Sequence, residues 1–255
     1  MMRSLLTVKG YKFLARDGEF GEVEDVLFDE NLWIIRYLVA NTGGWLSGRR
    51  VLIPPQSLGK PNWKDATLPV EMDKSGIEQS PPMDEHAPVS RQYEIMLHRY
   101  WRLQPYWVGD VTGGAFPIPM DVRGKEEDGR EEADASDESL SDPFLRSVKE
   151  VTGYNIEAED DGIGHVDDFL FDDEQWVVRY MVVDTRNWLP GRKVMIPLSW
   201  IKEISFADRN VAVDVTREAV KNSPKFDPNL PVNREQEQVL FDYYGRPHYE
   251  EVVKK

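Results

Sequence analysis

The chain has 255 residues and a net charge of −15, and it contains no cysteine. The absence of cysteine excludes disulfides, thiolate metal sites and a cysteine nucleophile, and the acidic balance opposes nucleic-acid binding, which needs a cationic footprint. No apolar run approaches the roughly 20 residues that span a bilayer, so we expect a cytoplasmic protein without a transmembrane segment.

One stretch of the sequence occurs twice. Residues 17–39 and 160–182 share a glycine, an aspartate, a Leu-Phe-Asp run, a tryptophan and an Arg-Tyr pair, at a constant offset of 143 residues. Self-similarity over such a length means that one structural unit is built twice. A chain of 255 residues is long enough for two domains.

The first part of each copy reads as strands. A short apolar strand is expected over residues 4–8, with its counterpart over 145–151. Residues 21–28 follow, and their apolar residues do not alternate cleanly, which predicts a β-bulge or a strong bend. Residues 29–32 are turn-like, and residues 33–40 form a β-branched and aromatic strand.

The second part of each copy contains two more strands and a helix. A loop leads to a strand that a proline ends, and a strictly alternating strand comes next. These strands are expected over 49–54 and 66–72 in the first copy and over 192–197 and 210–215 in the second. A short helix with a good N-cap residue closes each copy, over 90–101 and 233–244.

The region between the copies has a different composition. Residues 108–119 are rich in glycine and proline, and residues 121–142 hold ten acidic and three basic residues with almost no apolar ones. Such a composition predicts a disordered linker. We therefore expect a first unit over 1–107, a Gly/Pro-rich and then acidic linker over 108–143, and a second unit over 144–255.

Both copies resemble the PRC-barrel family. The resemblance rests on a Gly-x-Val-x-Asp strand, an apolar strand with an Arg-Tyr pair, and a Val-x-Ile-Pro strand. These lie at 21–25, 33–39 and 51–54 in the first copy and at 164–168, 176–182 and 194–197 in the second. The resemblance implies a mainly β fold, with two tandem small β-barrels of the PRC type, each closed by a short C-terminal helix.

The resemblance also implies a function. The family includes the cytoplasmic domain of the photosynthetic reaction centre H subunit and the C-terminal domain of a ribosome maturation factor, and both dock on a larger assembly. We therefore expect a non-enzymatic docking or assembly module that binds a protein complex, a membrane-associated or photosynthetic-type complex included. Two barrels in one chain can form an internal pseudo-dimer, and a homodimer is the other arrangement.

Each copy carries a structural signature around the arginine and tyrosine of its central strand. The signature residues are Gly21, Asp25, Arg36 and Tyr37 in the first copy, and Gly164, Asp168, Arg179 and Tyr180 in the second. Since a buried cation needs a partner, we expect Arg36 to pair with Asp25 and Arg179 with Asp168. The glycines mark positions that favour a residue without a Cβ atom.

The loops before the proline-ended strands carry candidate contact residues. Their tryptophans are interpreted either as plugs of the barrel or as anchors that face a partner. The neighbouring residues would form an exposed lip suited to docking. The candidate partner-facing residues are Trp45, Leu46 and Arg49 in the first copy, and Trp188, Leu189 and Arg192 in the second.

Acidic residues at the hairpin turns suggest a second hypothesis, a small-ligand or cation-binding sensor related to stress. Carboxylates are the ligands that hard cations prefer, although ordinary turn chemistry also explains these residues. They are Asp25, Asp29, Glu30, Asp168, Asp172, Asp173 and Glu174.

Motifs of catalysis are missing from the sequence. It contains no nucleophile elbow, P-loop, dinucleotide fingerprint or zinc-protease motif. The four histidines, His98 among them, do not recur at matched positions of the two copies. We therefore expect no catalytic residue, no cofactor and no metal.

Overall fold

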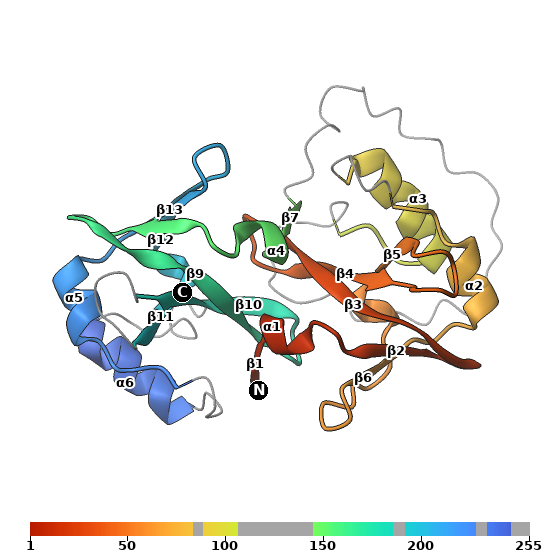
Figure 1. Cartoon of the computed structure of the whole chain (residues 1–255), viewed down its shortest axis with the longest axis horizontal. Coiled ribbons are helices and arrows are strands. Elements are labelled where there is room, and N and C mark those ends of the chain that lie inside the picture. Colours follow the sequence, from red (N-terminus) through yellow and green to blue (C-terminus); the bar gives the residue numbers. More distant parts are fainter. Residues whose placement is uncertain (84–88, 107–144, 186–191, 228–233, 246–255) are drawn as a thin grey trace. The chain divides into compact units, whose positions relative to one another are not determined.

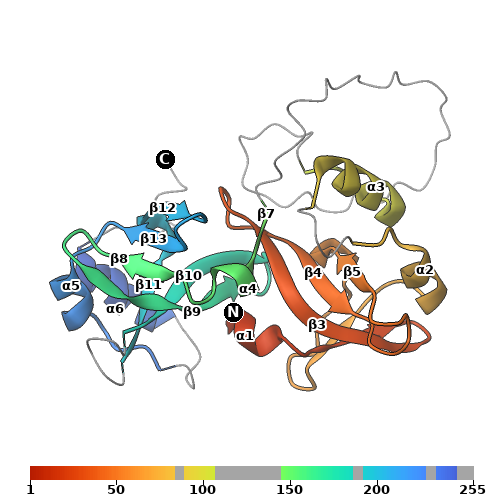
Figure 2. The same ribbon diagram turned by 45° about the horizontal axis from the view of Figure 1, so that its top comes forward.

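The computed structural model describes residues 1–83, 89–106, 145–185, 192–227 and 234–245. The predicted linker over 108–143 lies outside these residues. The described chain is mainly β, with two mixed sheets and a few short helices (Figures 1 and 2).

The first sheet is built mainly from the first copy of the repeat. Its strands lie in the order β5-β4-β3-β2-β6, and β7 also pairs with β3. The pairs β2/β3 and β4/β5 are antiparallel, whereas β2 and β6 run parallel. The bounds are β2 Lys12–Ala15, β3 Gly18–Asp29, β4 Ile35–Asn41, β5 Arg50–Ile53, β6 Thr67–Pro69 and β7 Leu145–Ser147.

The second sheet repeats this topology and adds one strand, β12. Its order is β11-β10-β9-β8-β13-β12, and β1 also pairs with β9. β8 and β13 run parallel, as their counterparts β2 and β6 do. The bounds are β1 Met2–Ser4, β8 Asn155–Glu157, β9 Gly162–Asp172, β10 Val177–Asp184, β11 Lys193–Pro197, β12 Ile201–Ser205 and β13 Asn210–Val213.

The predicted bulge is present in the second copy. The pairing of β9 with β10 shifts register between Val178 and Tyr180 and again between Val182 and Val183. At the second shift the unpaired residue is Asp167 on β9. An extra residue on one strand disrupts the ladder and bends the sheet, which explains why the apolar residues of this strand do not alternate.

The turn after β3 uses its aspartate in the way that turn chemistry predicts. The carboxylate Oδ1 of Asp29 accepts hydrogen bonds from the backbone amides of Asn31 (3.0 Å) and Leu32 (3.1 Å). Asp172 closes the equivalent turn after β9 in the same way, at 2.9 and 3.0 Å. Two of the acidic residues that suggested a cation site therefore hold the hairpin turns together.

The segments expected as the first strand of each copy are strands only in part. β1 ends at Ser4 and α1 (Leu5–Val8) follows, and β7 ends at Ser147 and α4 (Val148–Val151) follows. Each serine hydroxyl accepts a hydrogen bond at 3.0 Å from the backbone amide three residues later. Such a cap starts a helix, so the prediction of one continuous strand is wrong.

The two predicted closing helices are confirmed as α3 (Arg91–Trp101) and α6 (Arg234–Tyr244). The hydroxyl of Ser90 caps α3 by accepting a hydrogen bond from the amide of Tyr93 at 3.2 Å. The shorter helical elements are α2 (Lys74–Gln79), α5 (Arg217–Asn222), η1 (Pro55–Ser57) and η3 (Leu198–Trp200). Helix α2 lies near α3, and α5 lies near α6 (Figures 1 and 2).

The short strand that precedes each copy pairs with the long strand of the other copy. β1 aligns antiparallel with β9, so that Met2 lies opposite Asp172 and Ser4 opposite Leu170. Likewise, β7 pairs with β3. The chain thus contains a reciprocal pairing of its two halves, which we call the segment swap.

The chain divides into two compact units, and both swapped segments belong mainly to unit 1. Unit 1 contains Met1–Lys9, Asp25–Ile35 and Arg146–Lys255, and unit 2 contains Gly10–Glu24 and Arg36–Leu145. These bounds differ from the predicted units, because short pieces of the first copy belong with the second. Unit 1 therefore depends on three separate parts of the sequence.

Neither sheet closes into a barrel within the described residues, so the predicted β-barrels are not confirmed. At the edge strand β11, the amide of Phe226 donates a hydrogen bond to the carbonyl oxygen of Lys193 at 3.0 Å. At the edge strand β5, the amide of Met83 contacts the carbonyl oxygen of Arg50 at 3.5 Å. The chain after α2 and α5 thus uses edge groups that a closing strand would need.

Candidate functional site

Two aspartates, the buried Asp168 and the half-buried Asp25, hold the segment swap in place within unit 1. The carboxylate of Asp168 accepts hydrogen bonds from the Ser4 hydroxyl at 2.5 Å and from the backbone amides of Leu6 at 3.1 Å and Phe169 at 2.7 Å. Its burial raises the pKa of this carboxyl above the ordinary value. Three donors on one carboxylate fix both the capping serine and the first turn of α1.

Asp25 repeats this arrangement at the positions shifted by 143 residues. Its carboxylate accepts hydrogen bonds from the Ser147 hydroxyl at 2.5 Å and from the amides of Lys149 at 3.1 Å and Val26 at 2.8 Å. Burial raises the pKa of this carboxyl as well. Each copy thus supplies the aspartate that holds the other copy's serine.

Ion pairs accompany the two aspartates. Arg3 lies 2.5 Å from Asp173, and at the equivalent positions Arg146 lies 2.7 Å from Glu30. These acids, which suggested a cation site, are therefore paired with arginines. Among the residues that the structure describes, no group of three or more histidine or acidic side chains could hold a metal ion.

The predicted ion pairs of the two central arginines are not found. Asp25 and Asp168 bind the serines and amides described above, and the guanidinium of Arg36 instead lies over the ring of Tyr106, 3.7 Å from its centroid. Arg179 donates a hydrogen bond to Gln175 on its own hairpin. The prediction was wrong because the serine and amide donors already occupy the two carboxylates that the arginines were expected to bind.

The signature tyrosines connect the sheets to the closing helices. In unit 2 the Tyr37 hydroxyl lies 2.9 Å from Glu94 Oε1 on α3. In unit 1 the Tyr180 hydroxyl donates a hydrogen bond to Glu237 on α6 at 2.7 Å. Both glutamates are buried. The sequence analysis missed this contact, although both tyrosine–glutamate separations are 57 residues.

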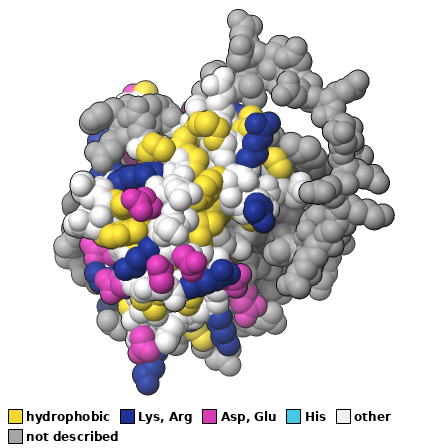
Figure 3. All heavy atoms as spheres, turned by 90° about the vertical axis from the view of Figure 1, so that its right-hand side faces the viewer, with side chains coloured by type: hydrophobic (Ala, Val, Ile, Leu, Met, Phe, Trp, Pro, Cys, Tyr) yellow, Lys and Arg dark blue, Asp and Glu magenta, His cyan; other side chains and the backbone are white. Residues whose placement is uncertain are grey.

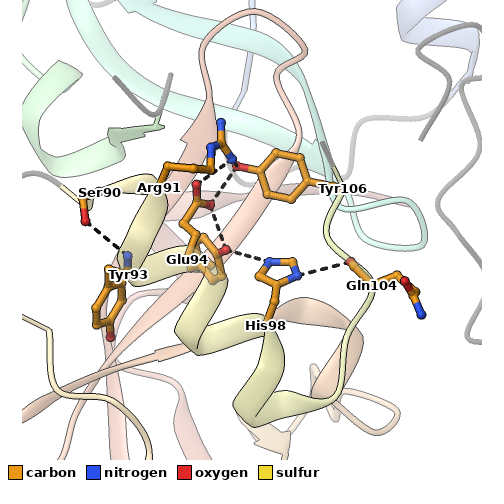
Figure 4. A network of polar contacts seen from close by, with 8 residues as sticks. Ser90, Arg91, Tyr93, Glu94, His98, Gln104 and Tyr106 are labelled. Carbon is orange, nitrogen blue, oxygen red and sulfur yellow. Dashed lines mark hydrogen bonds and ion pairs between the residues drawn. The ribbon is translucent and has the colours of Figure 1, made fainter. Parts of the chain in front are cut away.

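Unit 2 extends its tyrosine–glutamate contact into a larger polar cluster, which Figure 4 shows from close by. The Tyr37 hydroxyl also lies 2.9 Å from Nε2 of His98, whose Nδ1 lies 3.2 Å from the carbonyl oxygen of Gln104. Tyr106 donates a hydrogen bond to Glu94 at 2.7 Å. Arg91 donates to the other carboxylate oxygen of Glu94, at 2.7 Å, and to the Tyr106 hydroxyl, at 3.1 Å.

The candidate docking loop lies between β4 and β5. Trp45 is 36 % exposed, and Leu46 beside it is half-buried. The Trp45 ring contacts the buried ring of Phe20 edge-on, with 6.1 Å between centroids. This tryptophan therefore covers part of the core and presents the rest of its surface outward. Trp188 and Leu189, its predicted counterparts, lie outside the described residues.

Arg49 and Arg192 occupy equivalent places and bind backbone carbonyls. Arg49 donates hydrogen bonds to the carbonyl oxygens of Glu78, at 2.7 Å, and of Ser80, and Arg192 donates to that of Ser223. Each arginine thus ties the end of its loop to the end of the following short helix. Both were predicted to face a partner, a role that these contacts leave untested.

Part of the second copy matches a known protein family. Residues 146–220 match the family model of the PRC-barrel domain. Residues 146–220 are the part of the chain that is similar to this family. The match begins at Arg146 in β7 and ends in α5, so it covers most of the second sheet and the serine that binds Asp25.

The PRC-barrel is a protein-interaction domain, which makes binding or assembly the general function of such a module. Comparison with the curated proteins gave no match. Among the helices of the described residues, none has both the length and the apolar character that crossing a membrane requires.

We expect the Arg49→Ala variant to lower the free energy of unfolding by about 1–2 kcal/mol, because the carbonyl groups of Glu78 and Ser80 lose a charged donor. Thermal or urea unfolding measures this difference. Arg16→Ala removes an exposed arginine of the same unit and should change stability by less than about 0.5 kcal/mol. Equal stabilities of the two variants would contradict a structural role for Arg49.

Proposed function

We propose that the chain is a non-enzymatic cytoplasmic docking module that binds a protein complex, a membrane-associated one included, through the loop between β4 and β5. The observation that carries this proposal is the partly exposed ring of Trp45 on a loop whose base is closed by hydrogen bonds. Tryptophan is among the residues most enriched at binding hot spots.

The loop around Trp45 is preorganised by hydrogen bonds at its base. The backbone amide and the hydroxyl of Thr42 both donate to the carbonyl oxygen of Arg49, at 3.2 and 2.8 Å. The amide of Gly48 donates to the carbonyl oxygen of Gly43 at 2.6 Å. A loop that is already ordered loses less conformational entropy on binding, so more of the contact energy contributes to affinity.

Charge near the ring indicates the chemistry of the partner. The ammonium group of Lys74 lies 5.7 Å from the centroid of the Trp45 ring. Figure 3 views the end of unit 2 that carries α2 and α3, where hydrophobic side chains gather in a band with basic and acidic side chains around it. We therefore propose a partner surface with an apolar pocket and a carboxylate at its rim.

The first copy is proposed to be a PRC-barrel domain as well. Its strands correspond to those of the matched half at the offset of 143, and it repeats the same serine–aspartate and tyrosine–glutamate contacts. Two such domains in one chain would form an internal pseudo-dimer, which supports a role in holding the parts of an assembly together.

Capture with the tagged full-length chain from cells of its source tests the docking role. We expect a protein partner in stoichiometric amount, and Trp45→Ala should weaken its binding at least about tenfold in calorimetry with the purified partner. Leu32→Ala is the matched control, because this residue is 50 % exposed and lies in the turn after β3. Unchanged binding by Trp45→Ala, or an equal loss in both variants, would contradict the assignment of the loop.

A further inference from the structure

Tyr37, Glu94 and His98 form a chain of buried polar contacts in unit 2. This chain has more donor–acceptor contacts than hydrogens available to form hydrogen bonds. The Tyr37 hydroxyl lies 2.9 Å from both Glu94 Oε1 and His98 Nε2. His98 Nδ1 lies 3.2 Å from the carbonyl oxygen of Gln104, and because a carbonyl only accepts, Nδ1 must carry a hydrogen. A neutral His98 therefore presents Nε2 to Tyr37 as an acceptor.

An ionised Glu94 would present a second acceptor to the same hydroxyl. Burial raises the pKa of Tyr37 well above its ordinary value, so its hydroxyl keeps one hydrogen and can donate only once. With a neutral His98 and an ionised Glu94, one of the two contacts would have no hydrogen. An unfilled contact between buried polar groups costs about 1–3 kcal/mol.

We propose that the Glu94–Tyr37–His98 chain is a proton-binding site, which holds one proton beyond an ionised glutamate and a neutral histidine, and that loss of this proton loosens α3 from the first sheet. The proton fills the missing contact: protonated Glu94 donates to the Tyr37 oxygen, and Tyr37 donates to His98 Nε2. The ligand is the proton itself, and the site goes beyond the docking loop.

Burial places this proton on the glutamate. Glu94 is 0 % and His98 6 % exposed. Burial raises the pKa of the Glu94 carboxyl and lowers the pKa of the His98 imidazole, because both charged forms lose their hydration. Both directions favour a protonated Glu94 beside a neutral His98.

The charged and polar groups around the site lower the pKa of Glu94 and so counteract part of the effect of burial. Arg91 on α3 lies 2.7 Å from Glu94 Oε2, and the hydroxyl of Tyr106 lies 2.7 Å from Oε1. Arg36 on β4 stacks on the Tyr106 ring and also favours an ionised Glu94. With these cations and donors facing it, Glu94 can still release its proton as the pH rises.

The closing helix of the other unit provides an internal comparison. There the Tyr180 hydroxyl donates to Glu237 at 2.7 Å, and Phe241 stands at the position of His98. A phenyl ring offers no lone pair to the tyrosine. The position that His98 occupies on α3 therefore offers no acceptor nitrogen on α6.

The sign of the pH effect follows from the raised pKa of Glu94. A group whose pKa is raised by folding contributes stability that is complete below its unfolded pKa, about 4.3 for glutamate, and is lost as the pH rises through its folded pKa. The equilibrium for opening α3 should therefore increase by up to about tenfold per pH unit in this window and then level off.

Hydrogen–deuterium exchange of the full chain from about pH 5 to about pH 8, corrected for intrinsic exchange rates, tests the proposal. We expect the protection of α3 (Arg91–Trp101) to fall with rising pH, while the protection of α6 (Arg234–Tyr244) stays level. Equal pH dependence of the two helices, or a level profile for α3, would overturn the proposal.

Two variants, one at each end of the Glu94–Tyr37–His98 chain, test the proposed site. His98→Phe introduces the residue of the second unit, removes the second acceptor of the Tyr37 hydroxyl and should reduce the pH dependence of α3 protection. Glu94→Gln carries its hydrogens permanently and should give a level profile, and if His98→Phe fails to fold, this variant decides. Infrared spectroscopy of the native chain at about pH 5 should show a protonated carboxyl band that Glu94→Gln lacks. Retention of the native pH profile by a folded variant, or absence of the carboxyl band, would refute the site.

Discussion

Gly164→Ala is expected to lower the free energy of unfolding by about 3 kcal/mol or more, the largest effect of any single substitution considered. Gly164 has φ +132°, a conformation that side chains with a Cβ rarely adopt. A Cβ atom at this position would also overlap the carbonyl oxygen of Asp184 on the neighbouring strand. The overlap adds to the backbone strain. It cannot be relieved easily, because the carbonyl group of Asp184 is part of the backbone and cannot move aside as a flexible side chain can.

Thermal unfolding measures this effect, and about 3 kcal/mol corresponds to a fall in Tm of roughly 10 °C in a domain of this size. Gly153→Ala is the matched control. Gly153 also has a positive φ, +89°, but no atom lies within 4 Å of an added Cβ. Its substitution should cost only the strain, about 1 kcal/mol. Equal effects of the two substitutions would show that the close approach of β9 to β10 is unimportant.

The second large effect is expected for Asp168→Ala, which should destabilise unit 1 by about 2–4 kcal/mol and release the segment Met2–Val8. The substitution removes the acceptor of the Ser4 hydroxyl and of two backbone amides, Leu6 and Phe169. These donors then lie in a largely buried site with no partner of the same strength. Urea unfolding of the full chain gives the loss of stability.

The Asp168→Asn variant distinguishes the contribution of the hydrogen bonds to stability from that of the carboxylate charge. Asparagine keeps one carbonyl oxygen for the two amides, and we expect a loss below about 1 kcal/mol. Because burial raises the pKa of Asp168, its contribution is greatest below the unfolded pKa and declines as the pH rises through the folded pKa. This part of the pH dependence should vanish in the asparagine variant. A loss as large as that of Asp168→Ala would contradict the hydrogen-bond account.

The sequence predicts the repeated elements well, because their signals are local. The helices at 90–101 and 233–244 follow from their caps, and the turn at 29–32 follows from its aspartate. The closed barrels are not confirmed by the described residues. Closure depends on whether distant edge strands meet, and the chain after α2 and α5 lies against the edges instead.

The segment swap could not be read from the sequence, for a physical reason. Ser4 and Ser147 are the same residue at equivalent positions, as are Asp25 and Asp168. A serine bound to the aspartate of its own copy and one bound to the other copy's aspartate would use identical chemistry. Only the path of the chain distinguishes them.

The candidate site was found only in part. The arginine and tyrosine of each central strand were singled out, yet the arginines were assigned to Asp25 and Asp168, which bind serine and amide donors instead. The contacts of the tyrosines with Glu94 and Glu237 were missed. The burial of these two glutamates, at 0 % and 4 % exposure, depends on the sheet beneath each helix, which lies far away in the chain.

Hydrogen–deuterium exchange of two matched double variants tests the segment swap most directly. Ser4→Ala with Leu5→Ala should expose the amides of β9, in the second copy, and Ser147→Ala with Val148→Ala should expose the end of β3, in the first. Both variants remove a buried apolar side chain and a hydroxyl bound to an aspartate. The account predicts this crossed pattern. Faster exchange in the mutated copy's own long strand, with the other copy unchanged, would contradict it.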